Sequence, residues 1–173
     1  MEHYEESEYD WDLDIPYPKC MTDREKSWIK YFHQLAQVVA TKSKDESTQI
    51  GAVLVNHDNS IVSTGYNSFP RGIKDNIPER QERPEKYYWM EHAERNAIYN
   101  AARNGVSTIG TRLFMSCPMP CPDCARGIIN AGITELWISR DGGAKGEHWA
   151  EGFIRSEAML KEADVEVYYY DEI

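Results

Sequence analysis

Apolar residues recur at two spacings along this chain, one typical of helices and one typical of strands. Thr22-Asp23-Arg24-Glu25 forms a capping box, which predicts a helix that begins here and continues to about residue 42. The apolar residues of this helix that we expect to face the core are Trp28, Tyr31, Phe32, Leu35, Val38 and Val39. Two runs rich in β-branched residues, 49–56 and 61–66, flank the polar stretch 57–60, so they predict a β-hairpin.

The second half of the chain alternates between the two patterns. Helical spacing covers residues 91–104, 121–132 and 152–162, whereas strand patterns cover 112–116, 135–139 and 165–170. Because a helix separates the last two strands, we expect them to be parallel, since parallel strands need a long crossover connection. Residues 67–90 show no clear periodicity, and a segment of this length is typical of a lid or a binding loop.

Two short motifs lie where the helices at 91–104 and 121–132 are expected to begin. His92-Ala93-Glu94 places an imidazole and a carboxylate two residues apart, and Cys121 and Cys124 place two thiols on one helical face. One histidine and two cysteines can hold a zinc ion, and three protein ligands leave the fourth tetrahedral position open, as in catalytic zinc sites. The positive ends of two helices would also favour thiolates at such a site.

Glu94 is then free to move protons rather than to bind metal. Hydrolytic deamination of a nucleobase adds water to a ring carbon that carries an amino group, and then expels ammonia. Zinc lowers the pKa of a bound water from about 15.7 to about 7. A neighbouring carboxylate can take the water proton, pass it to the ring nitrogen and protonate the leaving amine. The order H-x-E followed by P-C-x-x-C is the pattern of zinc-dependent nucleobase deaminases, so the two motifs predict this chemistry.

A competing interpretation is a closed structural zinc site. Such a site would need a fourth ligand, for which the candidates are Cys117, Cys20 and His148, with Cys117 lying close to the C-x-x-C motif. The chain would then be a non-catalytic binding module whose zinc only staples the helices together. The presence of Glu94 favours the catalytic interpretation, because a structural site gives no reason for a carboxylate at this position.

Further blocks of sequence surround these motifs in a fixed order. They are Ile50-Gly51-Ala52-Val53-Leu54-Val55, Gly65-Tyr66-Asn67, Glu91-His92-Ala93-Glu94-Arg95-Asn96-Ala97-Ile98 and Pro120-Cys121-Pro122-Asp123-Cys124-Ala125-Arg126. Together they resemble the cytidine and deoxycytidylate deaminase superfamily, from about residue 22 to the end of the chain. Phe69-Pro70-Arg71-Gly72 and Arg83-Pro84-Glu85-Lys86-Tyr87 resemble its deoxycytidylate (dCMP) deaminase branch in particular.

The resemblance implies a cytidine-deaminase-like three-layer α/β/α fold, with a five-stranded mixed sheet whose last two strands are parallel. It implies a hydrolase that converts dCMP to dUMP and ammonia and so supplies the precursor for thymidylate synthesis. The cofactor would be Zn²⁺ on His92, Cys121 and Cys124. Glu94 would be the catalytic proton shuttle.

Three further residues are expected at the substrate because they match positions of the family. Asn67 matches the asparagine that contacts the sugar 3′-hydroxyl, and the backbone N–H of Ala93 would hold the base. Arg71 is the expected phosphate ligand, because it follows Asn67 in a Pro-Arg-Gly turn and can make bidentate contacts. The branch is commonly hexameric, which implies a homo-oligomer. Ser68 stands where the family's Gly-Tyr-Asn-Gly block, associated with control by dCTP and dTTP, has its second glycine.

Other substrates in the same enzyme class are dCTP, a 5-modified dCMP, and a free nucleoside or base. Small deaminases of free cytidine join their last two strands by a tight turn, whereas relatives that act on nucleotides, tRNA or polynucleotides insert a helix. The helix expected at 152–162 therefore weighs against free cytidine.

Charge narrows the possible partners. The chain has 173 residues and a formal net charge of −10 at pH 7. Binding a nucleic acid depends on lysine and arginine displacing counterions from phosphates, so we expect a small pyrimidine nucleotide as the partner and no nucleic acid. No apolar run is long enough to cross a membrane. Four cysteines, two of them in C-x-x-C, do not suggest a disulfide framework, which favours a reducing cytoplasm.

We expect the chain to divide into an acidic N-terminal tail or arm, residues 1–21, and a deaminase domain, residues 22–173. The first 17 residues carry seven acidic side chains and no lysine or arginine. Such a composition is typical of a disordered, solvated tail. The alternative is an extended arm that docks its aromatic residues on a neighbouring subunit.

Overall fold

The computed structural model describes residues 21–140 and 147–170 of the chain. The acidic tail expected at 1–21 lies outside the described residues except for its last position. Cys20, one of the candidate fourth zinc ligands, lies outside them too.

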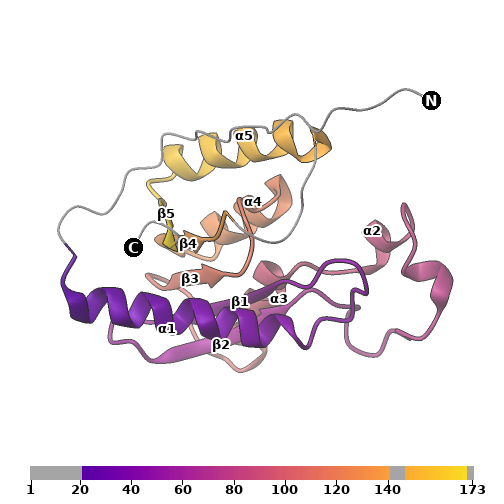
Figure 1. The fold of residues 1–173 in the computed structure, drawn as a ribbon, viewed down its shortest axis with the longest axis horizontal. Coiled ribbons are helices and arrows are strands. Elements are labelled where there is room, and N and C mark those ends of the chain that lie inside the picture. Colours follow the sequence, from indigo (N-terminus) through magenta and orange to yellow (C-terminus); the bar gives the residue numbers. More distant parts are fainter. Residues whose placement is uncertain (1–20, 141–146, 171–173) are drawn as a thin grey trace.

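The centre of the fold is a five-stranded sheet with the strand order β2-β1-β3-β4-β5 (Figure 1). The strands are β1 (Gly51–Val55), β2 (Ile61–Tyr66), β3 (Arg112–Met115), β4 (Glu135–Ile138) and β5 (Glu166–Tyr169). Strand β1 is antiparallel to β2 and to β3, whereas β3, β4 and β5 are parallel to one another. The predicted hairpin, the mixed five-stranded sheet and the parallel last pair are all confirmed.

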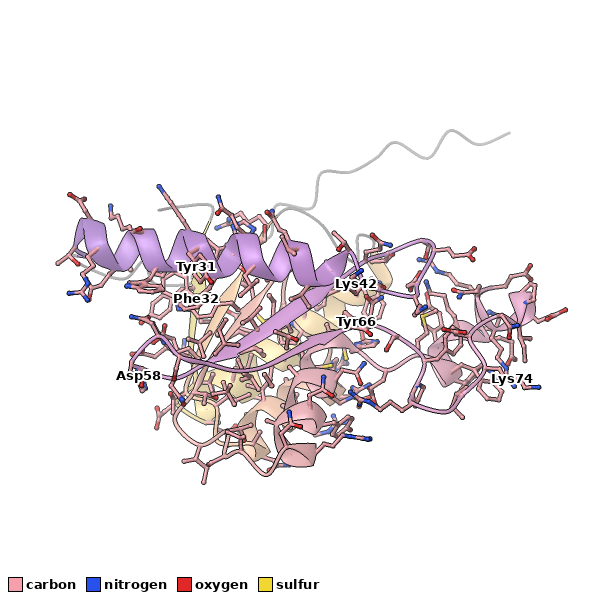
Figure 2. All side chains as sticks on the ribbon, turned by 90° about the horizontal axis from the view of Figure 1, so that it is seen from below. Tyr31, Phe32, Lys42, Asp58, Tyr66 and Lys74 are labelled. Atoms are coloured by element: carbon pink, nitrogen blue, oxygen red, sulfur yellow. The ribbon has the colours of Figure 1, made fainter. Side chains whose placement is uncertain are left out.

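Helices cover both faces of this sheet. One face carries α1 (Asp23–Ala40), and the other carries α3 (Ala93–Arg103), α4 (Pro122–Asn130) and α5 (Glu147–Glu162). Figure 2 shows the strands between α1 and the remaining helices, which confirms the three-layer architecture. The segment between β2 and α3 contains only η1 (Pro78–Arg80) and α2 (Lys86–Trp89), and its part around Lys74 extends away from the sheet (Figure 2).

Strand β1 is buried on both sides, so its side chains divide the core in two. Ala52 and Leu54 pack in the cluster beneath α3, α4 and α5, whereas Val53 and Val55 pack in the cluster beneath α1. This alternation follows from the two-residue period of a strand. A central strand that is apolar at every position is therefore what a three-layer fold requires.

Helix α1 begins as predicted, and half of its predicted inward face is confirmed, because Phe32 is buried and Leu35 and Val39 pack against the same core cluster. The Thr22 hydroxyl accepts a hydrogen bond from the Glu25 backbone N–H at 3.2 Å, and the Glu25 carboxylate accepts from the Thr22 N–H at 2.8 Å, which confirms the capping box. The expectation that Trp28, Tyr31 and Val38 face inward is wrong, because they are 36, 48 and 62% exposed. The buried residues are Ile29, Phe32, Ala36 and Ala40.

The face of α1 is chosen by how closely the helix approaches β1. A Cβ atom on Gly51 would lie 2.1 Å from the carbonyl oxygen of Ala36 and 2.5 Å from the backbone nitrogen of Ala40. Only small helical residues fit against the strand at this distance. The larger Trp28, Tyr31 and Val38 are therefore turned outward, although their spacing also fits a helical stripe.

Strand β2 and helix α3 make a second close approach, and this one positions the first motif. A Cβ atom on Gly65 would lie 2.2 Å from the carbonyl oxygen of Ala93 and 2.3 Å from the backbone nitrogen of Ala97. The first turn of α3 thus rests directly on the strand. His92 and Glu94 lie at this end of the helix, so the contact fixes their height above the sheet.

Two predicted boundaries differ from the structure in an informative way. Helix α3 begins at Ala93 rather than at residue 91, because His92 has an extended backbone and serves as the N-cap residue. Helix α5 begins at Glu147, five residues earlier than predicted, and so brings Trp149 into regular structure. No helix in the described ranges is long and apolar enough to cross a membrane.

Gly65→Ala is expected to lower the free energy of unfolding by about 1–3 kcal/mol, because the added methyl group overpacks the contact with α3. Urea denaturation of the two proteins measures the difference. Gly127→Ala in α4 is the matched control, since its new Cβ would lie an ordinary 3.6 Å from Arg95 Cγ. Replacing a glycine inside a helix should itself be neutral or stabilising. Equal midpoints for Gly65→Ala and the wild type would contradict the proposed contact.

Candidate active site

Three potential metal ligands meet where two helices begin. His92 is the N-cap residue of α3, Cys121 is the N-cap residue of α4, and Cys124 lies in the first turn of α4. The Sγ atoms of Cys121 and Cys124 each lie 3.5 Å from His92 Nδ1, and the three ligand atoms lie within 4.8 Å of one another. A tetrahedral zinc ion with these ligand types holds them roughly 3.5 Å apart, so the arrangement fits zinc.

The fold explains why these ligands converge. Strand β3 is parallel to β4, and the chain leaves the carboxyl end of β3 through residues 116–120 before α4 begins at Pro122. Ligands commonly bind beyond the carboxyl ends of parallel strands. Helix α3, held down on β2, brings its own amino end to the same place. The predicted meeting of two helix N-termini at the metal site is confirmed.

A hydrogen bond between the two thiols gives Cys121 and Cys124 very different acidities. A hydrogen bond between the thiols lowers the pKa of Cys121 to about 3, with further stabilisation of its thiolate by His92. The same hydrogen bond, together with burial, raises the pKa of Cys124 well above its ordinary value. One thiolate is thus already favoured before metal arrives. Zinc binding would release the remaining proton, because zinc takes cysteine as the thiolate.

Arg95 supports the second sulfur. Its Nη1 donates a hydrogen bond to Cys124 Sγ at 3.3 Å, and its Nε donates to Glu91 Oε1 at 2.6 Å. Burial works against the guanidinium charge, but the neighbouring Cys124 and Glu91 raise the pKa of Arg95, so it stays protonated. A permanent cation here offsets part of the negative charge that two thiolates bring to the site.

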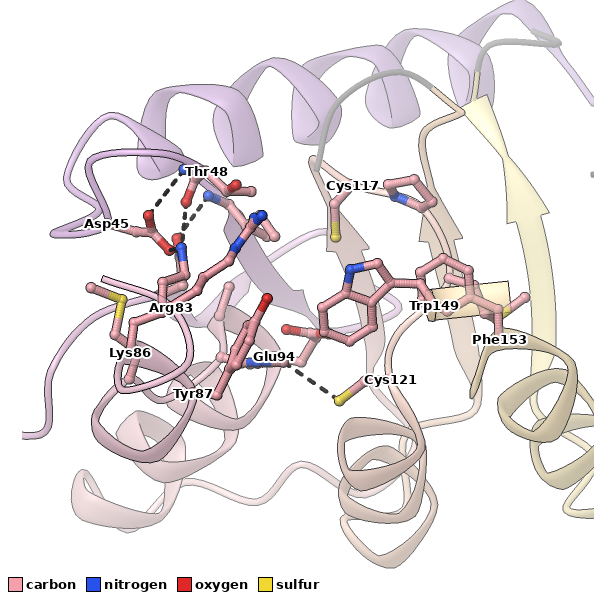
Figure 3. Close-up of a pocket in the computed structure, with 17 residues that line it drawn as sticks. Asp45, Thr48, Arg83, Lys86, Tyr87, Glu94, Cys117, Cys121, Trp149 and Phe153 are labelled. Atoms are coloured by element: carbon pink, nitrogen blue, oxygen red, sulfur yellow. Dashed lines mark hydrogen bonds and ion pairs between the residues drawn. The ribbon is translucent and has the colours of Figure 1, made fainter. Parts of the chain in front are cut away.

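Glu94 is buried in the pocket beside these ligands and is only 3% exposed. Burial raises the pKa of its carboxyl above the ordinary value, against the opposing effect of His92. Figure 3 shows the carboxylate between Tyr87 and Trp149, close to Cys121. A carboxyl group whose pKa is raised toward neutrality is suited to both accept and return a proton.

The pocket around Glu94 has two unlike sides (Figure 3). Asp45, Thr48, Arg83 and Lys86 form a polar side, and Trp149 and Phe153 form an aromatic side. The full lining is Asp45, Thr48, Ile50, Asn67, Arg83, Lys86, Tyr87, Met90, His92, Ala93, Glu94, Cys117, Pro118, Met119, Cys121, Trp149 and Phe153. An apolar cleft with a few polar groups directed at a metal site is typical of a small-molecule site.

The aromatic side joins segments that are distant in sequence. The Trp149 ring stacks on Phe153 with the ring centroids 6.1 Å apart, and Tyr87 meets Trp149 edge to face at 6.5 Å. Tyr87 belongs to α2 in the long β2–α3 segment, whereas the other two rings lie on α5. The predicted role of residues 67–90 as a binding loop therefore has a structural basis, because this segment forms one wall of the pocket.

Comparison with known families agrees with this geometry. The family model for the cytidine and deoxycytidylate deaminase zinc-binding region matches residues 26–140. The chain belongs to this family. The protein is therefore a zinc-binding deaminase-family member, and His92, Cys121 and Cys124 are positioned to hold the metal.

Similar proteins lie within the same family. An uncharacterized deaminase from the luxG 3′ region of Aliivibrio fischeri is 39% identical over 140 residues, covering 81% of this chain and 91% of that protein. Deoxycytidylate deaminase of Homo sapiens is 38% identical over 119 residues, covering 66% of this chain and 65% of the human protein. The chain thus aligns with slightly less than two thirds of the human enzyme.

A solved structure supports the fold. The apo crystal structure of dCMP deaminase from the cyanophage S-TIM5 superposes with a TM-score of 0.64 at 25% identity, covering 86% of this chain and 99% of that one. The three-layer fold expected of a cytidine-deaminase-like protein is therefore shown by the architecture and by this likeness.

Two of the predicted substrate residues line the pocket. Ala93 is buried at the start of α3, where the first N–H groups have no partner within the helix, so its N–H is placed to meet a ligand. Asn67 is also buried, and its Oδ1 accepts hydrogen bonds from the Ile50 N–H at 2.8 Å and the Ser43 hydroxyl at 2.7 Å. Its Nδ2 donates to the Thr48 carbonyl at 2.7 Å. The amide therefore anchors the pocket wall, and its contact with a sugar stays a prediction.

Arg71 lies elsewhere. Its Nη2 donates a hydrogen bond to Asn100 Oδ1 at 2.6 Å, and the side chain lines a separate hollow between β2 and α3. Among the residues that line the zinc pocket, Arg71 does not appear. Its role as phosphate ligand therefore stays a prediction from the sequence.

Three features of the pocket were not predicted from the sequence. The Asp45–Lys86 ion pair is buried in its wall, with Nζ 2.7 Å from Oδ2. Arg83 and Trp149 line the cavity. Lys86 and Arg83 belong to the block that resembles the dCMP deaminase branch, so a signal for them existed. No sequence signal pointed to Trp149, because it precedes residues 152–162, where the helical period was recognised.

Cys117 does not join the metal ligands. It is buried and lines the pocket, but the group of ligand atoms that could hold one ion among the described residues contains only His92, Cys121 and Cys124. The side chain of His148 and the whole of Cys20 are outside the part of the chain that the structure describes. The geometry of the described site is thus that of three protein ligands with a cavity beside them, which is typical of catalytic zinc.

Arg95→Ala is expected to weaken zinc binding about 10- to 100-fold, because groups that support a metal ligand commonly contribute this much. Competition with a chelator of known affinity measures the change. Arg126→Ala is the matched control, since Arg126 lies on α4 but pairs with Asp123 at the exposed surface. Zinc affinity in Arg95→Ala that equals that of the control would contradict a supporting role for the guanidinium.

Proposed function

We propose that this protein catalyses the hydrolytic deamination of dCMP to dUMP and ammonia, and so feeds thymidylate synthesis. The observation that carries the proposal is the meeting of His92, Cys121 and Cys124 beside the buried Glu94, in a pocket of a deaminase-family chain. The likeness to deoxycytidylate deaminases supports dCMP as the substrate.

The reaction uses the pocket as follows. Zinc on His92, Cys121 and Cys124 would supply the Lewis acidity that lets water attack a ring carbon near neutral pH. Glu94 accepts a proton from the attacking water and delivers it to N3 of the cytosine as the oxygen bonds to C4. It then passes the proton of the new C4 hydroxyl group to the amino group. The C4–N bond breaks, ammonia leaves, and the C4 carbonyl of uracil forms.

Other groups hold the base and the sugar. The backbone N–H of Ala93 would donate to the O2 carbonyl of the base and keep C4 beside Glu94. Asn67 would bind the sugar 3′-hydroxyl from its place in the pocket lining. The aromatic side formed by Trp149 and Phe153 would exclude water from the base.

We further propose that the deaminase domain spans residues 22–173 and that the acidic residues 1–21 are a separate tail or arm. We place the enzyme in a reducing cytoplasm, because the free thiols of Cys121 and Cys124 must stay reduced to bind zinc. We also propose that the protein forms a homo-oligomer, because the branch that the chain resembles is commonly hexameric. Light scattering measures the mass of the assembly and so tests this proposal.

Zinc-loaded protein is expected to turn over dCMP in preference to the other cytosine compounds. Loss of cytosine absorbance is followed for cytidine, deoxycytidine, CMP, dCMP and dCTP, each with and without added dCTP or dTTP. Preference for dCTP or for a nucleoside would show that the protein is a deaminase with a substrate other than dCMP. No turnover of any cytosine compound would refute the dCMP proposal and favour a modified pyrimidine, another base or a non-catalytic zinc site.

Glu94→Gln is expected to lower the turnover of dCMP about 10²- to 10⁴-fold, because the amide keeps the volume but cannot carry the proton. Zinc content measured on the same sample should remain at one ion per chain, since Glu94 is not a ligand. Glu162→Gln, at the exposed end of α5, removes the same charge away from the pocket and serves as the control. A turnover rate near that of the wild type in the zinc-loaded Glu94 variant would contradict the assigned role.

A further inference from the structure

The cationic side chains of the pocket differ sharply in what they contact. Apart from the metal ligand His92, the positively charged residues that line the pocket are Arg83 and Lys86. Both lie on its polar side, opposite Trp149 and Phe153 (Figure 3). Each could in principle meet an anionic substrate, so their contacts decide which of them is available.

Lys86 is already neutralised. Its Nζ lies 2.7 Å from Asp45 Oδ2 and donates to the Ser47 hydroxyl at 2.6 Å, and its side chain is only 7% exposed. Burial alone would raise the pKa of Asp45, but the hydrogen bonds from Lys86 and Ser47 outweigh it and lower that pKa, so the carboxylate stays charged. The pair thus adds no net charge to the pocket. Lys86 therefore connects α2 to Asp45 and Ser47 in the loop that follows α1.

Arg83 is not neutralised in this way. Among the described residues, its guanidinium has no hydrogen-bond or ion-pair partner, although it lines the pocket. A guanidinium presents several N–H donors in a fixed fork that matches the oxygens of a phosphate. The Thr48 hydroxyl lies on the same polar side and can donate to the same anion (Figure 3).

We propose that Arg83, rather than Arg71, binds the phosphate of the substrate, and that its single uncompensated charge suits a nucleoside monophosphate. This inference rests on the proposed function and names a residue for it. The base would lie between Glu94 and the aromatic side, and the phosphate would lie at the polar side. A triphosphate would bring further negative charges to a pocket whose second cation, Lys86, is already paired with Asp45.

Substitution of Arg83 tests the inference through a ratio that a general loss of activity does not change. In Arg83→Gln, the ratio of kcat/KM for dCMP to that for deoxycytidine is expected to fall about 10- to 100-fold, as loss of hydrogen bonds to a charged group predicts. Arg83→Lys should recover part of the ratio. Arg24→Gln, on the exposed surface of α1, is the matched charge control and should keep the wild-type ratio.

Arg71→Gln decides between the two arginines. If Arg71→Gln lowers the ratio and Arg83→Gln does not, the inference is overturned and the resemblance-based assignment stands. If the wild type fails to turn over dCMP, the proposed function fails, and binding then gives a separate test. Calorimetry with dUMP and deoxyuridine should still show tighter binding of dUMP that Arg83→Gln removes. Equal affinities for the two in the wild type would overturn the role of Arg83 as well.

Discussion

The close contact between strand β2 and helix α3 is the constraint on which the site depends. With no side chain at Gly65, the first turn of α3 rests on the backbone of the sheet, and His92 and Glu94 are carried to a defined height above it. At the same end of the sheet the chain runs from β3 to α4, which brings Cys121 and Cys124 close to the imidazole of His92. A zinc site assembled from two helix N-termini therefore needs no dedicated scaffold of its own.

The cations of the site differ in whether they are paired with a group of the protein. Arg95 balances the sulfur of Cys124, and Lys86 balances Asp45, so these two buried or half-buried cations serve the protein itself. Buried charges are costly unless they are paired, which explains why each has a specific partner. Arg83 remains at the polar side of the pocket with its donors available, which is why we propose it as the phosphate ligand. The acidic net charge of the chain thus coexists with one locally cationic position.

The prediction from sequence succeeded where a local pattern has a single physical interpretation. The capping box at Thr22 marks the start of α1, and the polar stretch 57–60 marks the hairpin turn, because both depend on neighbouring residues alone. The spacing of Cys121 and Cys124 limits the possible chemistry for the same reason. In helix α1, by contrast, two apolar stripes fit the helical period. The choice of Ile29 over Trp28 and Tyr31 came from the close approach at Gly51.

The sequence by itself determined the order of helices and strands, the parallel last pair and the three residues positioned to hold zinc beside Glu94, since each follows from short motifs or from a regular period. Only the tertiary structure decided which charged and aromatic side chains surround that carboxylate. Arg71 and Arg83 have the same chemistry and lie in the same long segment, yet the fold turns one to Asn100 and the other to the pocket. Trp149 reaches the pocket from a helix far along the chain. Such neighbours depend on how distant segments pack, and no local pattern contains that information.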